Sequence, residues 1–298
     1  MKFLLVYPET TGPDGDLLEV GPVGEVAAAA EAAGFDGFAL TEHPIPGARW
    51  LSAGGHQTLD PFVGLAFAAA ATSRIRLLTY LTVVPYRNPL LLAKTAASLD
   101  RLSGGRLILG VGTGYQKSEF RALGVYLDER NTLFDEALEV LPMAWSGEAF
   151  SYKGLHFDAR EVIAKPVPAQ NPIPIWIGGN AAITRRRVAE VGQGWMPLAG
   201  TKELSKTTRT PHIGSNEQLA DQIAMLREAA GPRGASIDVV VGYGAHSTDG
   251  WHEVDRHREA FADLARIGVT GVVVSAPSGP APRATEFIAG FGETYIKA

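Results

Sequence analysis

The chain has 298 residues, 46% of them hydrophobic and 20% charged, which is enough apolar material for one large domain or two small ones. Its formal net charge of -5 provides no overall positive field to attract nucleic acid or anionic lipid. The sequence contains no cysteine, which excludes disulfides, thiolate metal ligands and thiol nucleophiles.

The N-terminal residues MKFLLVYPET predict a first strand. They carry one positive charge and only a short apolar run before Pro8, whereas a secretory signal has a longer apolar stretch and a small-residue cleavage site. No apolar run in the chain approaches the ~20 residues that a membrane-spanning helix needs. We therefore expect a cytoplasmic protein that binds neither nucleic acid nor membranes.

Short apolar runs alternate along the chain with longer helical segments rich in alanine and leucine. Proline in the first turn and glycine after the last turn mark several helix ends. The expected strands are residues 2–7, 37–41, 76–84, 106–111, 173–177, 194–197, 238–243 and 271–275. The expected helices are residues 20–33, 61–71, 89–102, 117–123, 130–145, 181–190, 216–230, 253–267 and 284–295.

Eight strands that are apolar throughout, each followed by a helix, predict a parallel sheet covered on its outer face. Eight such units in about 300 residues favour a closed (β/α)8 TIM barrel over an open sheet. The alternation lapses at residues 147–172, where strand-like pieces at 149–152 and 155–158 predict a small inserted hairpin. No linker divides the chain, so we expect a single domain over residues 1–298.

In a barrel of this kind, the loops after the carboxyl ends of the strands form the active face. The polar and glycine residues at those positions are Glu9, Thr41, Glu42, His43, Thr79, Tyr80, Thr113, Gly178, Gly179 and Asn180, followed by the Gly200–Gly214 loop.

Thr41, Glu42 and His43 end the second expected strand. A histidine at this place is suited to proton transfer near neutral pH or to a hydrogen bond with a bound ring, which makes His43 and Glu42 the candidate catalytic residues. The alternative is that both side chains pair with neighbouring loops and hold the top of the barrel.

Two glycine-rich turns are candidate ligand sites. Residues 110–114 read GVGTG, which is not a dinucleotide fingerprint because Tyr115 stands at the sixth position. Glycine allows a flat ligand to approach the backbone, although a tight turn is an equal alternative. Gly178, Gly179 and Asn180 precede a helix, whose N-terminus favours phosphate; the alternative is an ordinary N-cap by Asn180.

The remaining polar segments carry weaker signals. Arg185, Arg186 and Arg187 point to different faces of a helix, so we expect most of this cluster to be solvated. The Gly200–Gly214 loop, with Lys202 and Lys206, is either a lid or a mobile connection. The histidines are scattered without HxH or HExxH spacing, so we expect no metal site.

Several of these motifs in order resemble the luciferase-like monooxygenase superfamily, and most closely its coenzyme F420-dependent oxidoreductases. They are Thr41–His43, the run LLTYLTVVPYRNPLLLAKTAASLDRLSGGRLILGVGTG, and residues 173–181. The resemblance implies a cofactor at the carboxyl-terminal mouth of a bacterial-luciferase-like barrel, with a non-proline cis peptide at Tyr80–Leu81 behind its ring. It implies a cofactor-binding set of Glu9, His43, Thr79, Tyr80, Leu81, Gly112, Thr113, Gly114, Gly178, Gly179 and Asn180.

Within that set, the resemblance places His43 near the ring or the substrate and residues 112–114 along the ring or ribityl chain. Residues 178–180 would take the phosphate.

The chain also departs from known members. Sugar-phosphate dehydrogenases of this branch have a glutamate general acid where Tyr115 stands, which argues against a sugar phosphate. Bacterial luciferase has a second histidine where Pro44 stands. The loop at residues 45–56, with Trp50 and His56, is expected to face the substrate.

The resemblance implies an oxidoreductase that transfers hydride between coenzyme F420, a deazaflavin, and a small organic substrate. The alternatives are an FMN-dependent monooxygenase of the luciferase or alkanesulfonate type, a non-catalytic flavin-binding protein, and an unrelated barrel hydrolase or lyase. Relatives are often homodimers. The sequence specifies neither the substrate nor the direction of hydride transfer.

Overall fold

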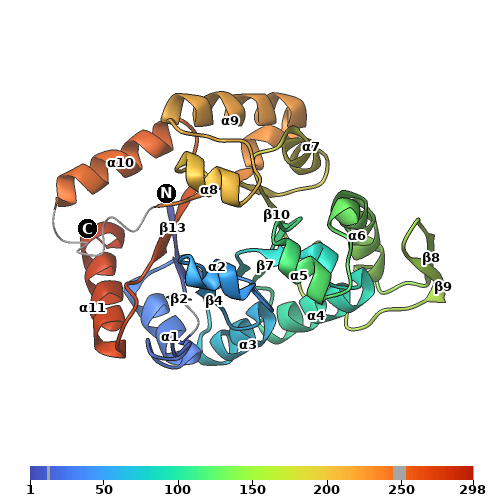
Figure 1. Ribbon diagram of the computed structural model, residues 1–298, viewed down its shortest axis with the longest axis horizontal. Coiled ribbons are helices and arrows are strands. Elements are labelled where there is room, and N and C mark those ends of the chain that lie inside the picture. The colour runs from blue at the N-terminus through green and yellow to red at the C-terminus, as the bar shows by residue number, and fades with distance from the viewer. Residues whose placement is uncertain (12–13, 244–252, 298) are drawn as a thin grey trace.

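The computed structural model describes residues 1–11, 14–243 and 253–297. Eight of its strands form a closed parallel barrel. They pair in the order β10-β11-β12-β13-β1-β3-β5-β7, and the first and last of them, β10 and β7, also pair with each other. Figure 1 shows the helices arranged around this ring of strands. The barrel strands are β1 (Lys2–Val6), β3 (Gly37–Leu40), β5 (Arg76–Thr79), β7 (Leu107–Gly112), β10 (Ile175–Gly178), β11 (Gly194–Met196), β12 (Asp238–Gly242) and β13 (Gly271–Ser275).

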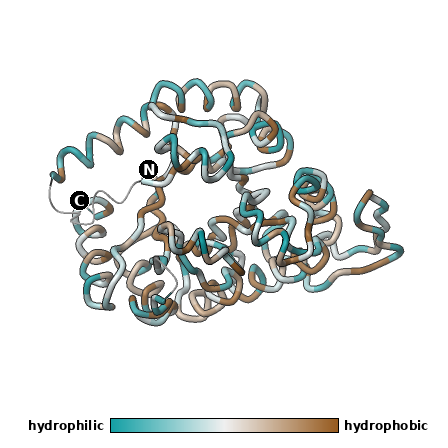
Figure 2. Tube along the Cα trace, in the orientation of Figure 1, coloured by the Kyte–Doolittle hydropathy of each residue, from teal (hydrophilic) through white to brown (hydrophobic). Residues whose placement is uncertain are grey.

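The strands read as continuous apolar runs because both of their faces are buried. Alternate side chains fill the barrel interior, where Leu4, Leu78, Trp176 and Val240 belong to one buried cluster. The other side chains pack against the helices and form a larger buried cluster. In Figure 2 hydrophobic and hydrophilic colouring alternate along the helices. The predicted TIM barrel is confirmed.

The helices begin and end where local capping chemistry places them. Asp60 accepts hydrogen bonds from the backbone N–H groups of Phe62 and Val63, and Asn88 accepts one from Leu90. Gly34 ends its helix in the left-handed conformation, with φ 99°. The main helices are α1 (Val23–Ala33), α3 (Pro61–Ala71), α4 (Pro89–Leu102), α6 (Arg130–Trp145), α7 (Ala182–Glu190), α9 (Asn216–Ala230), α10 (Val254–Arg266) and α11 (Ala281–Phe291).

The third barrel strand is shorter than the predicted span of residues 76–84. β5 ends at Thr79, the Tyr80–Leu81 peptide is cis as the resemblance implied, and β6 (Thr82–Val83) then pairs with β7. A 3-10 turn, η1 (Val84–Tyr86), follows. The predicted strand is therefore two short strands joined at the mouth of the barrel.

The inserted hairpin is present as an antiparallel pair, β8 (Phe150–Lys153) and β9 (Asp158–Val162), which projects from the barrel in Figure 1. The second strand lies further along than the predicted residues 155–158. Residues 155–157 form the turn instead, because the Glu136 carboxylate accepts the backbone N–H groups of Leu155, His156 and Phe157.

Smaller elements cover the carboxyl-terminal mouth. The strand pair β2 (Thr10–Thr11) and β4 (His56–Gln57) lies beside α2 (Ala48–Ser52), and α5 (Lys117–Ala122) follows β7. The Gly200–Gly214 loop contains a short helix, α8 (Lys202–Thr207), capped by Thr201. The other short turns are η2 (Leu127–Glu129), η3 (Gly231–Ser236) and η4 (Gly292–Ile296). Within the described ranges, no helix is long and apolar enough to cross a membrane.

Candidate functional site

A cavity of ≈ 360 Å³ lies at the carboxyl-terminal mouth of the barrel. It is bordered by the segments that follow β1, β3, β5, β7, β10 and β11, together with the start of α6 and the end of the α8 loop. Of the residues expected at the site, those that line the cavity are Glu9, Glu42, His43, Tyr80, Leu81, Gly112, Thr113, Gly114, Gly178 and Gly179.

Thr79 and Asn180 do not line the cavity. Thr79 is fully buried and donates its hydroxyl proton to the Gly110 carbonyl at 2.7 Å. The Asn180 amide donates to the carbonyl groups of Leu198 and Pro211 and accepts from the Leu198 N–H. Because both of its N–H groups are used, the Asn180 side chain has no donor left for a phosphate.

Asn180 is not the N-cap of α7 either, since that position belongs to Ala181, which has no side-chain cap. The interpretation of Asn180 as an ordinary N-cap is therefore corrected. Its role in the structure is to fasten the loops that follow β11 and α8.

The glycines around Leu81 are explained by close packing. A Cβ atom on Gly112 would lie 2.6 Å from Leu81 Cδ1, and one on Gly178 would lie 2.7 Å from the same atom. Gly114 has φ +75°, which a side chain would strain. Gly112 and Gly178 let the Leu81 side chain pack against the neighbouring strands β7 and β10.

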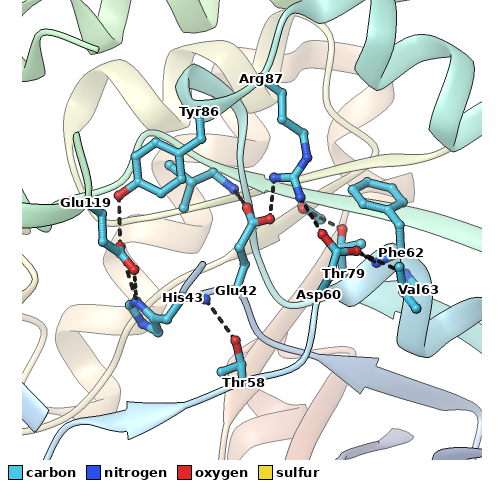
Figure 3. A network of polar contacts seen from close by, with 12 residues as sticks. Glu42, His43, Thr58, Asp60, Phe62, Val63, Thr79, Tyr86, Arg87 and Glu119 are labelled. Carbon is cyan, nitrogen blue, oxygen red and sulfur yellow. Dashed lines mark hydrogen bonds and ion pairs between the residues drawn. The ribbon is translucent and has the colours of Figure 1, made fainter. Parts of the chain in front are cut away.

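His43 contacts a buried carboxylate that the sequence analysis did not identify. Its Nδ1 atom lies 3.3 Å from Glu119 Oε1, and Tyr86 donates its hydroxyl proton to Glu119 Oε2 at 2.9 Å (Figure 3). The Glu119 side chain is only 1% exposed. Burial, followed by the charge of Glu119, raises the pKa of Tyr86, which keeps that hydroxyl a donor.

Glu42 faces a different set of partners, although it is adjacent to His43 in the chain. Its carboxylate forms an ion pair with Arg87 and accepts the Val83 N–H at 2.6 Å (Figure 3). Burial raises the pKa of Glu42, while Arg87 and the Val83 amide act in the opposite direction. Glu42 therefore ties the end of β3 to β6, which is the pairing alternative from the sequence analysis.

Aromatic rings surround the His43 side chain. The ring centroids of Trp50 and His56 lie 4.7 Å and 4.9 Å from that of His43, and the Tyr115 hydroxyl lies 3.4 Å from His43 Nε2. Burial, and then the charge of His43, lowers the pKa of His56 to about 4, so His56 is neutral at pH 7. This end of the cavity is aromatic, and it also holds Glu9, whose carboxylate lies 3.3 Å from His56.

The end of the cavity beside α7 is basic. Gly178 and Gly179 precede α7, and Arg130, Arg187 and Arg209 also border the cavity. In the arginine cluster at residues 185–187, which was expected to be mostly solvated, Arg186 is exposed and Arg187 is the buried member. Arg187 is only 2% exposed and bonds to Asp135 at 2.6 Å, with its guanidinium 4.7 Å from the Phe134 ring centroid.

Sequence reasoning missed Glu119, Tyr86 and Arg130 because the strand-end rule selects only residues directly after a strand. Glu119 had one usable signal, since it falls in the first turn of the helix predicted soon after the GVGTG turn. Arg130 comes from the start of α6, and nothing in its local pattern indicated the cavity. Among the described residues, no group of three or more His, Asp or Glu side chains could hold a metal ion.

Two curated proteins illustrate the similarity at the sequence level. The chain is 30% identical over 261 residues to an uncharacterized protein of Mycobacterium tuberculosis, covering 84% of this chain and 83% of that protein. It is 31% identical over 184 residues to an F420-dependent glucose-6-phosphate dehydrogenase of Gordonia bronchialis, covering 59% of this chain and 52% of that enzyme.

Two solved structures share the fold. A monooxygenase from Streptomyces bottropensis superimposes with a TM-score of 0.76 at 22% identity, covering 100% of this chain and 99% of that one. The coenzyme F420-dependent tetrahydromethanopterin reductase from Methanopyrus kandleri gives 0.72 at 20% identity, covering 99% and 98%. The family model for luciferase-like monooxygenases matches residues 1–270. The chain therefore belongs to the luciferase-like monooxygenase family.

Proposed function

We propose that this protein binds coenzyme F420 in the mouth of the barrel and transfers hydride between it and a small organic substrate. The observation that carries the proposal is a single cavity that joins a basic end beside a helix N-terminus to an aromatic end that holds His43. The F420-dependent relatives from Gordonia bronchialis and Methanopyrus kandleri support the choice of cofactor.

The basic end suits the phosphate of the cofactor. A helix N-terminus presents backbone N–H groups that lack intrahelical partners, and α7 begins at Ala182, three residues after Gly179. Arg130 and Arg209 add positive charge at the same end. The exposed Lys202 and Lys206 of the neighbouring α8 suit the acidic polyglutamate tail of coenzyme F420, which FMN lacks.

The aromatic end suits the ring and the substrate. Leu81, Gly112 and Gly178 form an apolar surface on which a tricyclic ring would rest, with His43 bordering the same cavity. When bound, a deazaflavin supplies hydride transfer at C5 of its ring, without oxygen. The chain orients the reactants, excludes water with its aromatic side chains, and holds a proton at His43.

An FMN-dependent monooxygenase is the second candidate, because the same basic end would accept the phosphate of FMN and the Streptomyces bottropensis neighbour is a monooxygenase. A flavin-binding protein without turnover would use the same contacts. The choice between F420 and FMN therefore rests on the lysines of α8 and on the F420-dependent relatives.

Titration of the purified protein with coenzyme F420 and, separately, with FMN tests the proposal through the fluorescence of each cofactor. We expect F420 to bind at least about tenfold more tightly than FMN, a difference of about 1.4 kcal/mol in binding free energy. Preference for FMN would favour the monooxygenase, and a failure to bind either cofactor would overturn the cofactor assignment.

A matched pair of glycine variants tests the position of the cofactor. Gly179→Ala places a Cβ atom 3.3 Å from Thr184 Oγ1, at a residue with φ +116°, and we expect it to weaken F420 binding by about tenfold. The control is Gly104→Ala, which also changes a left-handed glycine, with φ +72°, but meets nothing within 4 Å and does not line the cavity. Equal binding losses in the two variants would contradict the proposed position.

A further inference from the structure

His43 lies between a carboxylate and a phenol. Glu119 faces its Nδ1 atom at 3.3 Å, and the Tyr115 hydroxyl faces its Nε2 atom at 3.4 Å. Glu119 belongs to α5, and Tyr115 precedes that helix by two residues. The three side chains therefore form a line that runs from a nearly buried carboxylate to a phenol on the cavity wall.

The hydrogen-bonding capacity of these groups fixes where the protons lie. A carboxylate only accepts hydrogen bonds, and Glu119 already accepts one from Tyr86. The proton of a neutral His43 therefore belongs on Nδ1, where it donates to Glu119. Nε2 is then an acceptor, and Tyr115 is the donor that faces it. Burial, and then Glu119 and Glu9, raises the pKa of Tyr115 to about 12, so its hydroxyl is protonated at neutral pH.

The other polar groups near His43 are engaged elsewhere. Glu42 pairs with Arg87 and the Val83 amide. His56 presents its Nε2 atom to Glu9 at 3.3 Å, and its ring meets the His43 ring edge to face. Tyr115 is thus the described side chain with a polar atom within hydrogen-bond distance of His43 Nε2.

From this geometry we infer that Glu119 is a positioning residue that fixes the tautomer of His43, and that Tyr115 passes the proton between His43 and the substrate. For the identity of the reaction, this inference rests on the proposed function. The arrangement of the protons on His43, Glu119 and Tyr115 is inferred independently of that function.

The proton balance follows directly. When a substrate X–H group loses its proton, the Tyr115 oxygen accepts it while the original Tyr115 proton moves to His43 Nε2. The imidazolium that results carries a proton on each nitrogen and is stabilised by the Glu119 carboxylate. If a deazaflavin is bound, it would accept the two electrons separately, as hydride from the substrate carbon. In the opposite direction, His43 returns the proton through Tyr115.

Nitrogen-15 NMR of the imidazole groups tests the inference without cofactor or substrate. The protein is labelled with 15N-histidine, and the signals of His43 are identified by their loss in His43→Asn. On the alkaline side of the titration, we expect the proton of His43 to reside on Nδ1. A neutral His43 with its proton on Nε2 would overturn the inference, because Nδ1 would then face a carboxylate as an acceptor.

Variants separate the two roles. Glu119→Gln is expected to shift His43 toward the Nε2–H tautomer, whereas Tyr115→Phe is expected to keep the Nδ1–H tautomer because it removes only the donor on the other side. An unchanged tautomer in folded Glu119→Gln would contradict the positioning role. If Glu119→Gln does not fold, the wild-type spectrum alone decides.

Turnover provides the second measurement. With any substrate that the F420-loaded protein converts, Tyr115→Phe is expected to lower kcat by about 10²-fold, the range of general acid–base catalysis, with KM changed far less. An unchanged kcat would overturn the role of Tyr115. Failure of the wild-type protein to bind F420 would instead contradict the proposed function, and the tautomer measurement would remain interpretable.

Discussion

Glu42 and Arg87 form an ion pair directly behind His43, and this pair shows how single residues hold the site in place. The Glu42 side chain is 2% exposed and that of Arg87 is 22% exposed, while Arg87 also bonds to Asp60 at 3.0 Å. A carboxylate this deeply buried is stable only while its charge is paired and its oxygens accept hydrogen bonds. The pair therefore fixes the strand end from which His43 projects.

Removal of this charge is expected to destabilise the whole fold. Glu42→Gln leaves the Arg87 guanidinium without its buried partner, and the free energy of unfolding should fall by about 3 kcal/mol, as for other broken buried pairs. Urea unfolding followed by tryptophan fluorescence measures this value. The control Asp158→Asn breaks the exposed pair with Arg160 and should leave the midpoint unchanged. Equal midpoints for wild type and Glu42→Gln would mean that the pair does not hold the barrel top.

At the scale of secondary-structure elements, a single carboxylate joins the end of α1 to the start of β5. Glu31, in the last turn of α1, accepts the backbone N–H groups of Ser73, Arg74 and Ile75. Burial alone would raise the pKa of Glu31. The three N–H donors, with the charge of Arg74, outweigh that effect and lower the pKa to about 2. The loop before β5 is held in register by this contact.

This contact predicts a pH-dependent stability difference. The pKa of Glu31 is lower in the folded state than its ordinary value of 4.5, so its stabilisation is complete above about pH 4.5 and is lost as the pH falls toward 2. At pH 7, Glu31→Gln should lower the free energy of unfolding by up to about 3 kcal/mol. Urea unfolding of both proteins at several pH values measures the gap between them. A gap that stays constant from pH 7 to pH 3 would contradict the assignment.

At the scale of the whole molecule, the sequence predicted those helices and strands that local residue patterns specify. Proline in the first turn placed α3 and α4 at residues 61–71 and 89–102, and eight apolar strands implied the closed barrel. The strand prediction over residues 76–84 was too long because apolar composition alone does not record the break at Tyr80–Leu81. Only the family resemblance located that break.

The site was predicted less completely, because its key contacts join residues far apart in the chain. His43 and Glu119 are separated by 76 positions, and Arg187 reaches Asp135 over 52 positions. No local pattern records such pairs. The N-cap interpretation of Asn180 was wrong for a related reason, since its side-chain amide donates instead to carbonyl groups in loops from later in the sequence.

The central claim is that the whole barrel mouth, from the α8 lysines to His43, is built for a deazaflavin. Native mass spectrometry of the protein mixed with equal concentrations of coenzyme F420 and FMN tests this claim most directly, because the two cofactors compete for one cavity. We predict a one-to-one complex with F420 as the dominant species. A dominant FMN complex, or a spectrum of free protein alone, would contradict the account.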